Sequence, residues 1–221
     1  MKSRNLHPWN VTVKQAIAIQ QRLRGKIIKE DRTGKINYVA GVDVGFEDKG
    51  KITRAAIVVL DFPSLALRET SVARLPTSFP YVPGLLSFRE LPAVLKACTR
   101  IEQAPDLILC DGQGIAHPRR IGIASHLGLL TNLPSIGVGK SRLTGTHNEV
   151  GVTKGAWTPL LDQNEVIGAV LRTRTGVNPV YISIGHKVSL EVAIEYVLAC
   201  TTTFKLPETT RMAHRHASVV P

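Results

Sequence analysis

The pattern of apolar and polar positions divides the first part of the chain into one helix and three strands. A helix is predicted to begin at Thr12, since Thr12 and Gln15 can form a capping box. Apolar residues then recur at positions 13, 17, 23 and 27, a spacing compatible with one helical face. Three strands are predicted at residues 38–46, 52–62 and 65–75. The connections between them are too short for a crossover helix, so we expect antiparallel hairpins.

The remainder of the chain alternates helices with strands. A proline-rich loop at residues 76–84 precedes a helical region that continues to about residue 103, with an interruption near Pro92. The pattern then predicts a strand at 106–111, a helix at 121–130, a strand at 135–138, strands at 165–173 and 178–184, and a helix at 190–199. This order predicts one α/β domain over residues 1–221, with a mixed sheet, helices on both faces and a short tail from about residue 215.

Composition excludes several classes of protein. The 221 residues are 43% hydrophobic and 20% charged, which is too apolar for a disordered chain. The longest apolar run, residues 55–60, is far shorter than a membrane span, and no signal peptide is visible. Three cysteines without a Cys-x-x-Cys spacing favour a cytoplasmic protein without disulfides. The net charge of +11 favours a polyanionic partner such as nucleic acid, the alternative being a merely basic soluble protein.

Two carboxylates lie in apolar strand segments, where an unpaired charge is costly. Asp43 is in the first predicted strand and Asp111 ends the fourth. If these strands are parallel neighbours, the two acids are adjacent, and Glu90 can approach from the helix that follows the proline-rich loop. Three carboxylates suit Mg²⁺ or Mn²⁺ and the two-metal hydrolysis of a phosphodiester. The alternative is that Asp43 and Asp111 only cap strand ends or bind arginine.

One motif suggests a competing class of enzyme. Residues 137–141, Gly-Val-Gly-Lys-Ser, resemble the end of a Walker A loop, and residues 107–111 resemble a Walker B strand. Position 134, however, is Pro where the Walker pattern needs Gly, and the B-like strand precedes the A-like loop. A P-loop NTPase is therefore disfavoured, while Lys140 remains a candidate contact to phosphate beside the carboxylates.

Six segments, at residues 38–46, 79–90, 111–119, 122–128, 136–143 and 206–214, resemble the endonuclease V family in their order and sequence. The motifs Pro-Tyr-x-Pro-Gly and Asp-Gly-x-Gly-x-x-His-Pro-Arg are the most specific. The resemblance implies an RNase H-like fold and a Mg²⁺-dependent DNA-repair endonuclease, with Mn²⁺ as a substitute ion. It also implies recognition of deoxyinosine and hydrolysis of the second phosphodiester bond 3′ to it, leaving 3′-hydroxyl and 5′-phosphate ends.

The resemblance also assigns roles to individual residues. It places the metal at Asp43, Glu90 and Asp111, with Lys140 near the scissile phosphate and His214 near the metal. Tyr81, flanked by Pro80, Val82 and Pro83, matches the wedge that enters the space left by the displaced base. The small-residue pocket for that base is matched by Gly84, Leu86, Gly112, Gly114, His117, Gly122, Ile123 and Gly137. His126 is expected to be structural and His216 a solvated tail residue.

Two positions depart from the family pattern. Thr209 stands where Pro is expected, which would loosen the approach to His214, and Gly139 stands where Ala is usual. Arg119, Arg120 and the basic first helix are candidates for contacts to the DNA backbone. The expected partner is DNA that contains deoxyinosine, bound by a monomer. An inosine-specific ribonuclease acting on RNA or single strands, and a non-cleaving nucleic-acid-binding protein, are the alternatives.

Overall fold

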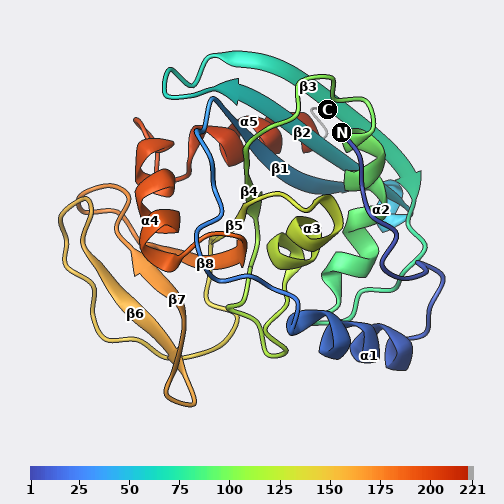
Figure 1. The fold of residues 1–221 in the computed structure, drawn as a ribbon, viewed down its shortest axis with the longest axis horizontal. Helices are drawn as coiled ribbons and strands as arrows, with labels where there is room; N and C mark the ends of the chain where they lie inside the picture. Colours follow the sequence, from blue (N-terminus) through green and yellow to red (C-terminus); the bar gives the residue numbers. More distant parts are fainter. Residues whose placement is uncertain (219–221) are drawn as a thin grey trace.

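The computed structural model describes residues 1–218, which form one eight-stranded sheet with helices on both faces (Figure 1). The helices are α1 (Val13–Arg24), α2 (Leu86–Cys98), α3 (Ile123–Thr131), α4 (Leu190–Ala199) and α5 (Glu208–Ala217). The strands are β1 (Tyr38–Glu47), β2 (Ile52–Asp61), β3 (Leu67–Pro76), β4 (Leu107–Asp111), β5 (Ser135–Gly139), β6 (Trp157–Asp162), β7 (Glu165–Leu171) and β8 (Val180–His186).

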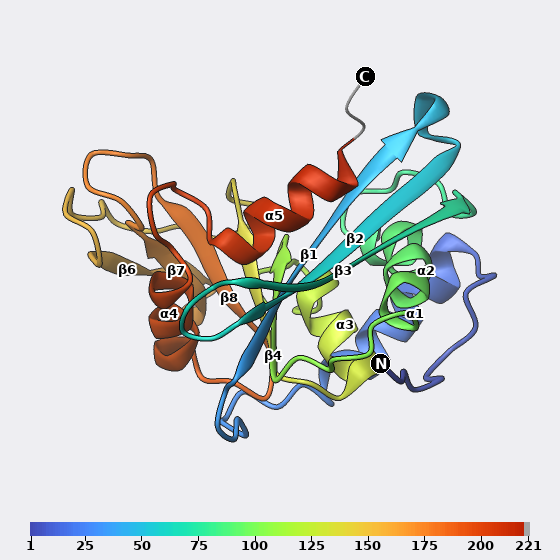
Figure 2. The ribbon, with the colours of Figure 1, turned by 90° about the horizontal axis from the view of Figure 1, so that it is seen from above.

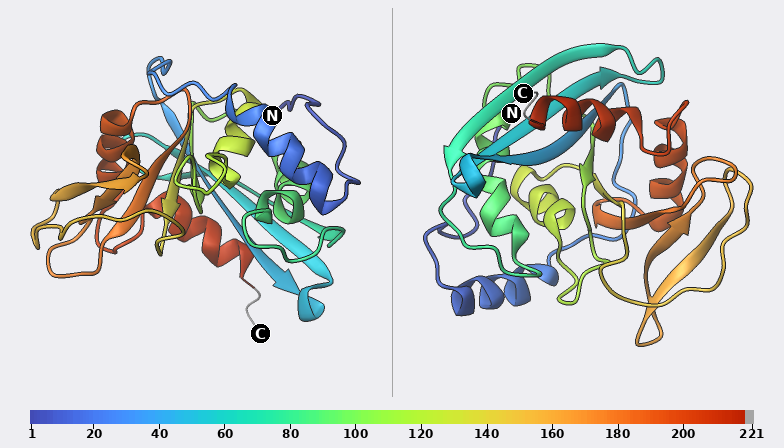
Figure 3. Two further views of the ribbon diagram at one scale, coloured as in Figure 1. Left: turned by 90° about the horizontal axis from the view of Figure 1, so that it is seen from below. Right: turned by 180° about the vertical axis from the view of Figure 1, so that it is seen from behind.

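The sheet is mixed, and its strand order is β3-β2-β1-β4-β5-β8-β7-β6. Strand β4 is parallel to β1 and to β5, whereas the other neighbours are antiparallel. The hairpin of β6 and β7 forms the end of the sheet opposite β3 (Figure 3). Three antiparallel strands followed by parallel ones confirm the predicted RNase H-like arrangement, including the parallel pairing of β1 with β4.

Alternation along β1 and β4 divides the core between the two faces of the sheet. Val39, Leu107 and Leu109 pack with α4 on one face, and Ala40 and Ile108 pack with α2 and α3 on the other. Figure 2 shows α4 and α5 on one side of the central strands and α2 and α3 on the other. The catalytic candidates Asp43 of β1 and Asp111 of β4 therefore lie on strands that are buried on both faces.

Several predicted boundaries need correction. Helix α2 runs through Pro92 without a break, because burial of residues such as Leu91 and Val94 outweighs one missing backbone hydrogen bond. Strand β6 and helix α5 were not predicted at all. Residues 215–217, expected in the tail, belong to α5, and residues 219–221 lie outside the described residues. Among residues 1–218, no helix has the length and apolar composition to cross a membrane.

Candidate active site

Asp43 and Asp111 lie side by side on two parallel strands, Asp43 in the middle of β1 and Asp111 at the carboxyl end of β4. Val42 of β1 is paired with Cys110 of β4, so the residues that follow them are neighbours on one face of the sheet. This confirms the predicted adjacency of the two acids. The predicted catalytic roles follow from the resemblance and stay predictions.

Helix α5 brings a histidine to this pair of acids. Gly41 and Gly45 point to the same face of β1 as Asp43, and their missing Cβ atoms let the backbone of α5 lie directly on the strand at Thr209 and Ala217. His214 Nδ1 then lies 2.6 Å from Asp43 Oδ2. Ligand atoms of Asp43, Asp111 and His214 all lie within 4.8 Å of one another, which is compatible with a shared metal ion.

Glu90 of α2 lines the same cavity and lies near enough to Asp43 and Asp111 for their charges to act on it, but it is not in the group of ligand atoms within 4.8 Å of one another. Burial, together with the charges of Asp43 and Asp111, raises the pKa of Glu90 to about 8. Burial and the charge of Asp43 also raise the pKa of Asp111, while Lys140 opposes this shift through an ion pair with the Asp111 carboxylate. Crowded carboxylates of this kind favour a divalent cation, since its charge relieves their repulsion. Oxygen donors with one imidazole fit Mg²⁺ or Mn²⁺.

A cavity of about 410 Å³ opens beside the acids and contains most of the predicted site. Predicted residues that line it are Asp43, Tyr81, Pro83, Gly84, Leu86, Glu90, Asp111, Gly112, His117, Gly122, Ile123 and Lys140. Pro80, Val82, Gly114, Gly137 and His214 are not among its lining residues. Sequence reasoning missed Gln20, Val44, Ser87, Gln113, Ser141, Arg142 and Leu143. The last three directly follow Lys140 in the sequence, so the prediction for Lys140 could have been extended to them. Nothing in the pattern of α1, in contrast, indicated that Gln20 faces the cavity.

Residues 80–84, which we call the wedge loop, present an aromatic side chain at the mouth of the cavity. Tyr81 is 70% exposed and Pro80 and Pro83 are also exposed. Val82 instead packs against the cluster of Ala16, Phe79, Leu85 and Phe88. Within the predicted wedge, Val82 is therefore an inward anchor, and the aromatic ring lies outside the packed core.

Two of the predicted pocket glycines serve backbone packing rather than the cavity wall. A Cβ on Gly137 would meet the backbone of Gly112–Gly114, and a Cβ on Gly114 would meet the carbonyl of Ile184. These glycines let the loop after β4 lie directly on β5 and β8. The departure at Gly139 has a similar explanation, because the Gln113 side chain occupies the space of a Cβ there and donates to Ser141 O at 3.0 Å.

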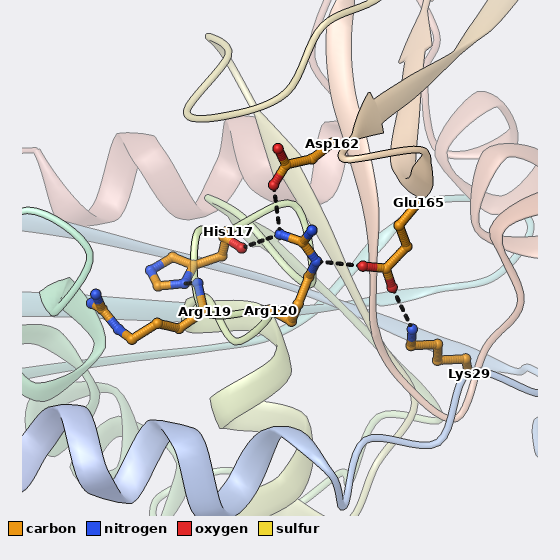
Figure 4. Close-up of polar contacts among 6 residues, drawn as sticks. All are labelled: Lys29, His117, Arg119, Arg120, Asp162 and Glu165. Carbon is orange, nitrogen blue, oxygen red and sulfur yellow. Dashed lines mark hydrogen bonds and ion pairs between the residues drawn. The ribbon is translucent and has the colours of Figure 1, made fainter.

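The two arginines proposed for DNA backbone contacts bind other parts of this protein. Arg120 donates to Asp162 Oδ2 at 2.9 Å and to Glu165 Oε2 at 2.7 Å, and Glu165 also pairs with Lys29 (Figure 4). Arg119 points in the opposite direction in Figure 4 and binds α1 and the wedge loop. Their guanidinium groups are thus used to join elements.

Three further expectations concern histidine and threonine side chains. His126 is fully buried and bonds to His7 and Ser87, which confirms a structural position. The expectation that His216 is a solvated tail residue is wrong, because it is half-buried in α5 and its carbonyl accepts from Arg54 Nε at 2.8 Å. Thr209 is fully buried in the first turn of α5, the helix that carries His214, and its effect on the approach to His214 stays a prediction.

Comparison with known proteins gives consistent results at the level of sequence. A sequence model of the endonuclease V family, described as Endonuclease V, matches residues 21–215. An endonuclease V of Trichormus variabilis is 62% identical over 213 residues, which are 96% of this chain and 96% of that protein.

Solved structures agree. The endonuclease V of Bacillus subtilis superposes with a TM-score of 0.93 at 30% identity, covering 98% of this chain and 95% of that one. The endonuclease V of Ciona intestinalis, in complex with a DNA containing an inosine followed by a ribo-adenosine, superposes with a TM-score of 0.81 at 31% identity, covering 93% of this chain and 96% of that one. The family match spans most of the chain, and both sequence and fold agree with it. The chain belongs to the endonuclease V family.

Proposed function

We propose that this protein is a metal-dependent endonuclease that cleaves DNA at deoxyinosine, acting as a single-domain monomer. The observation that carries the proposal is the convergence of Asp43, Asp111 and His214 within 4.8 Å beside the cavity of about 410 Å³. A cavity of that volume is in the range of small-ligand sites, and a base rotated out of a duplex is a ligand of this kind. The inosine-containing DNA bound by the Ciona protein supports the substrate class.

The metal would be held by Asp43, Asp111 and Glu90, with His214 beside it. Mg²⁺, or Mn²⁺ in its place, would supply charge neutralisation at the phosphate and activation of water. His214 would donate a hydrogen bond from Nδ1 to Asp43 Oδ2 at 2.6 Å and so orient the Asp43 carboxylate. Lys140, at the rim beside Asp111, is positioned to bind a phosphate oxygen once a substrate displaces its ion pair.

Lesion recognition is assigned to the wedge loop and the adjoining cavity. Tyr81 would stack in the duplex where the displaced base had been, which offsets part of the unstacking cost. The glycine-rich wall, at Gly84, Gly112 and Gly122, has no side chains and would let the flat hypoxanthine base approach the backbone closely. Cleavage is proposed at the second phosphodiester bond 3′ to the lesion, with 3′-hydroxyl and 5′-phosphate ends.

The test uses a labelled duplex with one deoxyinosine, incubated with the protein and Mg²⁺ or EDTA, and products mapped to the nucleotide. A Mg²⁺-dependent nick at the second 3′ bond supports the proposal. A lesion-specific gel shift without a nick would favour the non-cleaving binding protein.

An inosine-specific ribonuclease is the second candidate. The observation in its favour is the ribo-adenosine that follows the inosine in the DNA bound by the Ciona protein. If the protein cleaves inosine-containing RNA and leaves the deoxyinosine duplex intact, the proposed metal-dependent cleavage stands but the substrate is RNA and not DNA.

A further inference from the structure

The wedge loop is fastened at both ends and free at its tip. Before the loop, Arg89 Nη1 donates to the carbonyl of Phe79 at 2.8 Å, and Phe79 itself is buried. At the end of the loop, the carbonyl of Gly84 accepts hydrogen bonds from three side chains. Between these anchors Tyr81 is 70% exposed. The position of its ring therefore depends on how firmly the two ends are held and on Val82, which packs against the core beside it.

The three donors to Gly84 O come from two separate elements. Gln20 Nε2 of α1 lies at 2.9 Å, and His117 Nε2 and Arg119 Nη2 of the loop after β4 lie at 3.0 and 2.7 Å. A carbonyl oxygen has two lone pairs, so three donors use its accepting capacity fully. Gly84 has φ of +77°, and a Cβ there would lie 2.6 Å from Arg119 Nη2, so only glycine permits this approach.

The proton positions in this cluster follow from the bonds. His117 Nδ1 accepts from the backbone N–H of Arg119 at 3.1 Å, so Nε2 carries the proton and donates to Gly84 O. Burial and the nearby Arg119 lower the pKa of His117 to about 4, which keeps the ring neutral. The bonding pattern needs that neutral tautomer.

Gln20 joins the donors into one unit. Its side-chain Oε1 accepts from Arg119 Nε at 2.5 Å, and its Nε2 also faces the carbonyl of Ile121 at 3.4 Å. Gln20 is only 1% exposed, although most residues of α1 are exposed. One amide thus bonds to the wedge loop and to the turn that leads into Gly122 and Ile123, and both segments contribute to the cavity lining.

We propose that Gln20 and Arg119 are positioning residues that fix the wedge loop relative to the base cavity. The inference rests on the proposed function, because it concerns how Tyr81 is held when a base leaves the duplex. Without the amide of Gln20, the Gly84 carbonyl loses a donor, Arg119 loses its acceptor, and α1 is no longer bonded to the loop. The tip then samples more positions, and binding of the lesion must order it again.

The first experiment compares Gln20→Met with Gln21→Met, the same change at the exposed neighbouring position of α1. Nicking kinetics on the deoxyinosine duplex and thermal unfolding are measured for both. Gln20→Met is expected to raise KM about tenfold with kcat changed by less than about threefold, which is the signature of lost binding energy. Gln21→Met is expected to match the wild type. A wild-type KM for Gln20→Met overturns the inference.

A double-mutant cycle separates positioning of the wedge from general damage to the fold. If Gln20 acts through Tyr81, then Gln20→Met is expected to change KM by less than about twofold in a Tyr81→Ala background. Full additivity of the two changes would overturn the inference.

Gln20→Glu keeps the shape and the acceptor for Arg119 but removes both amide donors. It is expected to raise KM as Gln20→Met does, and it provides the same test if Gln20→Met fails to fold. A wild-type KM for a folded Gln20→Glu would contradict the role of the donor. Absence of nicking by the wild type would overturn the proposed function and this inference together, whereas an active wild type with unaffected Gln20 variants overturns the inference alone.

Discussion

At the scale of single residues, Asp43 shows how the sheet accommodates a nearly buried carboxylate. Its oxygens accept from the backbone N–H of Val44 at 2.8 Å and contact His214 Nδ1 at 2.6 Å. Gly41 and Gly45, on the same face of β1, remove the side chains that would hold α5 away. The spacing Gly-x-Asp-x-Gly therefore makes room for a helix above the acid, and this helix supplies the histidine.

Asp111→Asn is expected to abolish nicking while the fold stays intact. The amide keeps the shape but removes a charge that helps to hold the divalent cation, so activity should fall about 1,000-fold or more, equivalent to several kcal/mol of transition-state stabilisation. Removing one of several crowded carboxylates should leave the metal-free melting temperature unchanged or higher. Nicking assays and thermal unfolding, each with and without Mg²⁺, check both expectations.

The matched control is Asp106→Asn, the same change just before the other end of β4. Asp106 Oδ2 accepts from the backbone N–H groups of Asn37 and Tyr38, away from the site. This variant should retain nicking. Activity of Asp111→Asn equal to that of the wild type would exclude the metal-binding assignment.

Thr209→Val is expected to stabilise the protein without changing its activity. Thr209 is fully buried, and its hydroxyl has no hydrogen-bond partner among residues 1–218. Replacing an unpaired buried hydroxyl by a methyl of similar shape should raise the free energy of unfolding by about 1 kcal/mol, or about 2–4 °C in melting temperature for a chain of this length. Thermal unfolding measures the shift, and a lower melting temperature would mean that the hydroxyl has a bonding role.

At the scale of secondary-structure elements, short connections and apolar segments bounded by turns or loops made β1, β2, β3 and β4 predictable. Helix α5 was not, because it packs through small and polar residues such as Thr209, Ala213 and Ala217 against a glycine-bearing strand, and this leaves no apolar periodicity. Strand β6 is an edge strand that contains Pro159, a residue that sequence reasoning assigns away from strands. The same contrast holds for the site. The adjacency of Asp43 and Asp111 was predicted because both lie on strands with a clear pattern, whereas Gln20, on α1, was missed.

The turn after β4 connects distant elements through two successive arginines. Arg119 bonds to α1 and the wedge loop, and Arg120 bonds to Asp162 and Glu165 at the tip of the β6–β7 hairpin. Ala116 of the same turn also packs in one apolar cluster with Leu160, Ile167 and Val170 of the hairpin. Both the ion pairs of Arg120 and this packing are therefore expected to hold the hairpin in position.

Arg120→Met should loosen the β6–β7 hairpin. Arg120 is largely buried, but its partners are partly exposed, so after allowing for solvent screening the loss of stability is expected to be about 1–2 kcal/mol. Amide hydrogen exchange should speed up in residues 157–171 and stay unchanged in β1 and β4.

Lys29→Met is the control for this variant. It removes only the exposed member of the same network, at 3.1 Å from Glu165, and should cost less than about 0.5 kcal/mol. If Arg120→Met leaves exchange in the hairpin unchanged, these ion pairs do not hold it.

At the scale of the whole molecule, the charge of +11 is distributed so that many acids are already paired. Glu47 pairs with Arg54 and Arg74, and Glu208 pairs with Arg211. The excess lysines and arginines thus leave a positive field, while three acids, Asp43, Glu90 and Asp111, gather around one cavity. The positive field attracts the phosphates of a nucleic acid, and the group of acids attracts a cation.

Buried histidines predict how the stability of the whole protein changes with pH. Burial lowers the pKa of His7, and lowers that of His126 to about 3 and those of His117 and His186 to about 4, from an ordinary 6.5. These rings are neutral in the folded protein but take up protons on unfolding below pH 6.5. Their contribution is therefore complete above pH 6.5 and is lost as the pH falls toward 4.

Denaturant unfolding should therefore show lower stability at pH 5 than at pH 7, with a loss of about 1–2 kcal/mol from each of His117, His126 and His186. Glu90 and Asp111 act in the opposite direction, since burial raises the pKa of Glu90 to about 8 and also raises that of Asp111, but they are two groups against four. Self-repulsion of a basic protein also grows in acid, so both measurements are repeated in high salt, which screens long-range repulsion and leaves buried proton uptake in place. Equal stability at the two pH values in high salt would mean that these rings are protonated without unfolding.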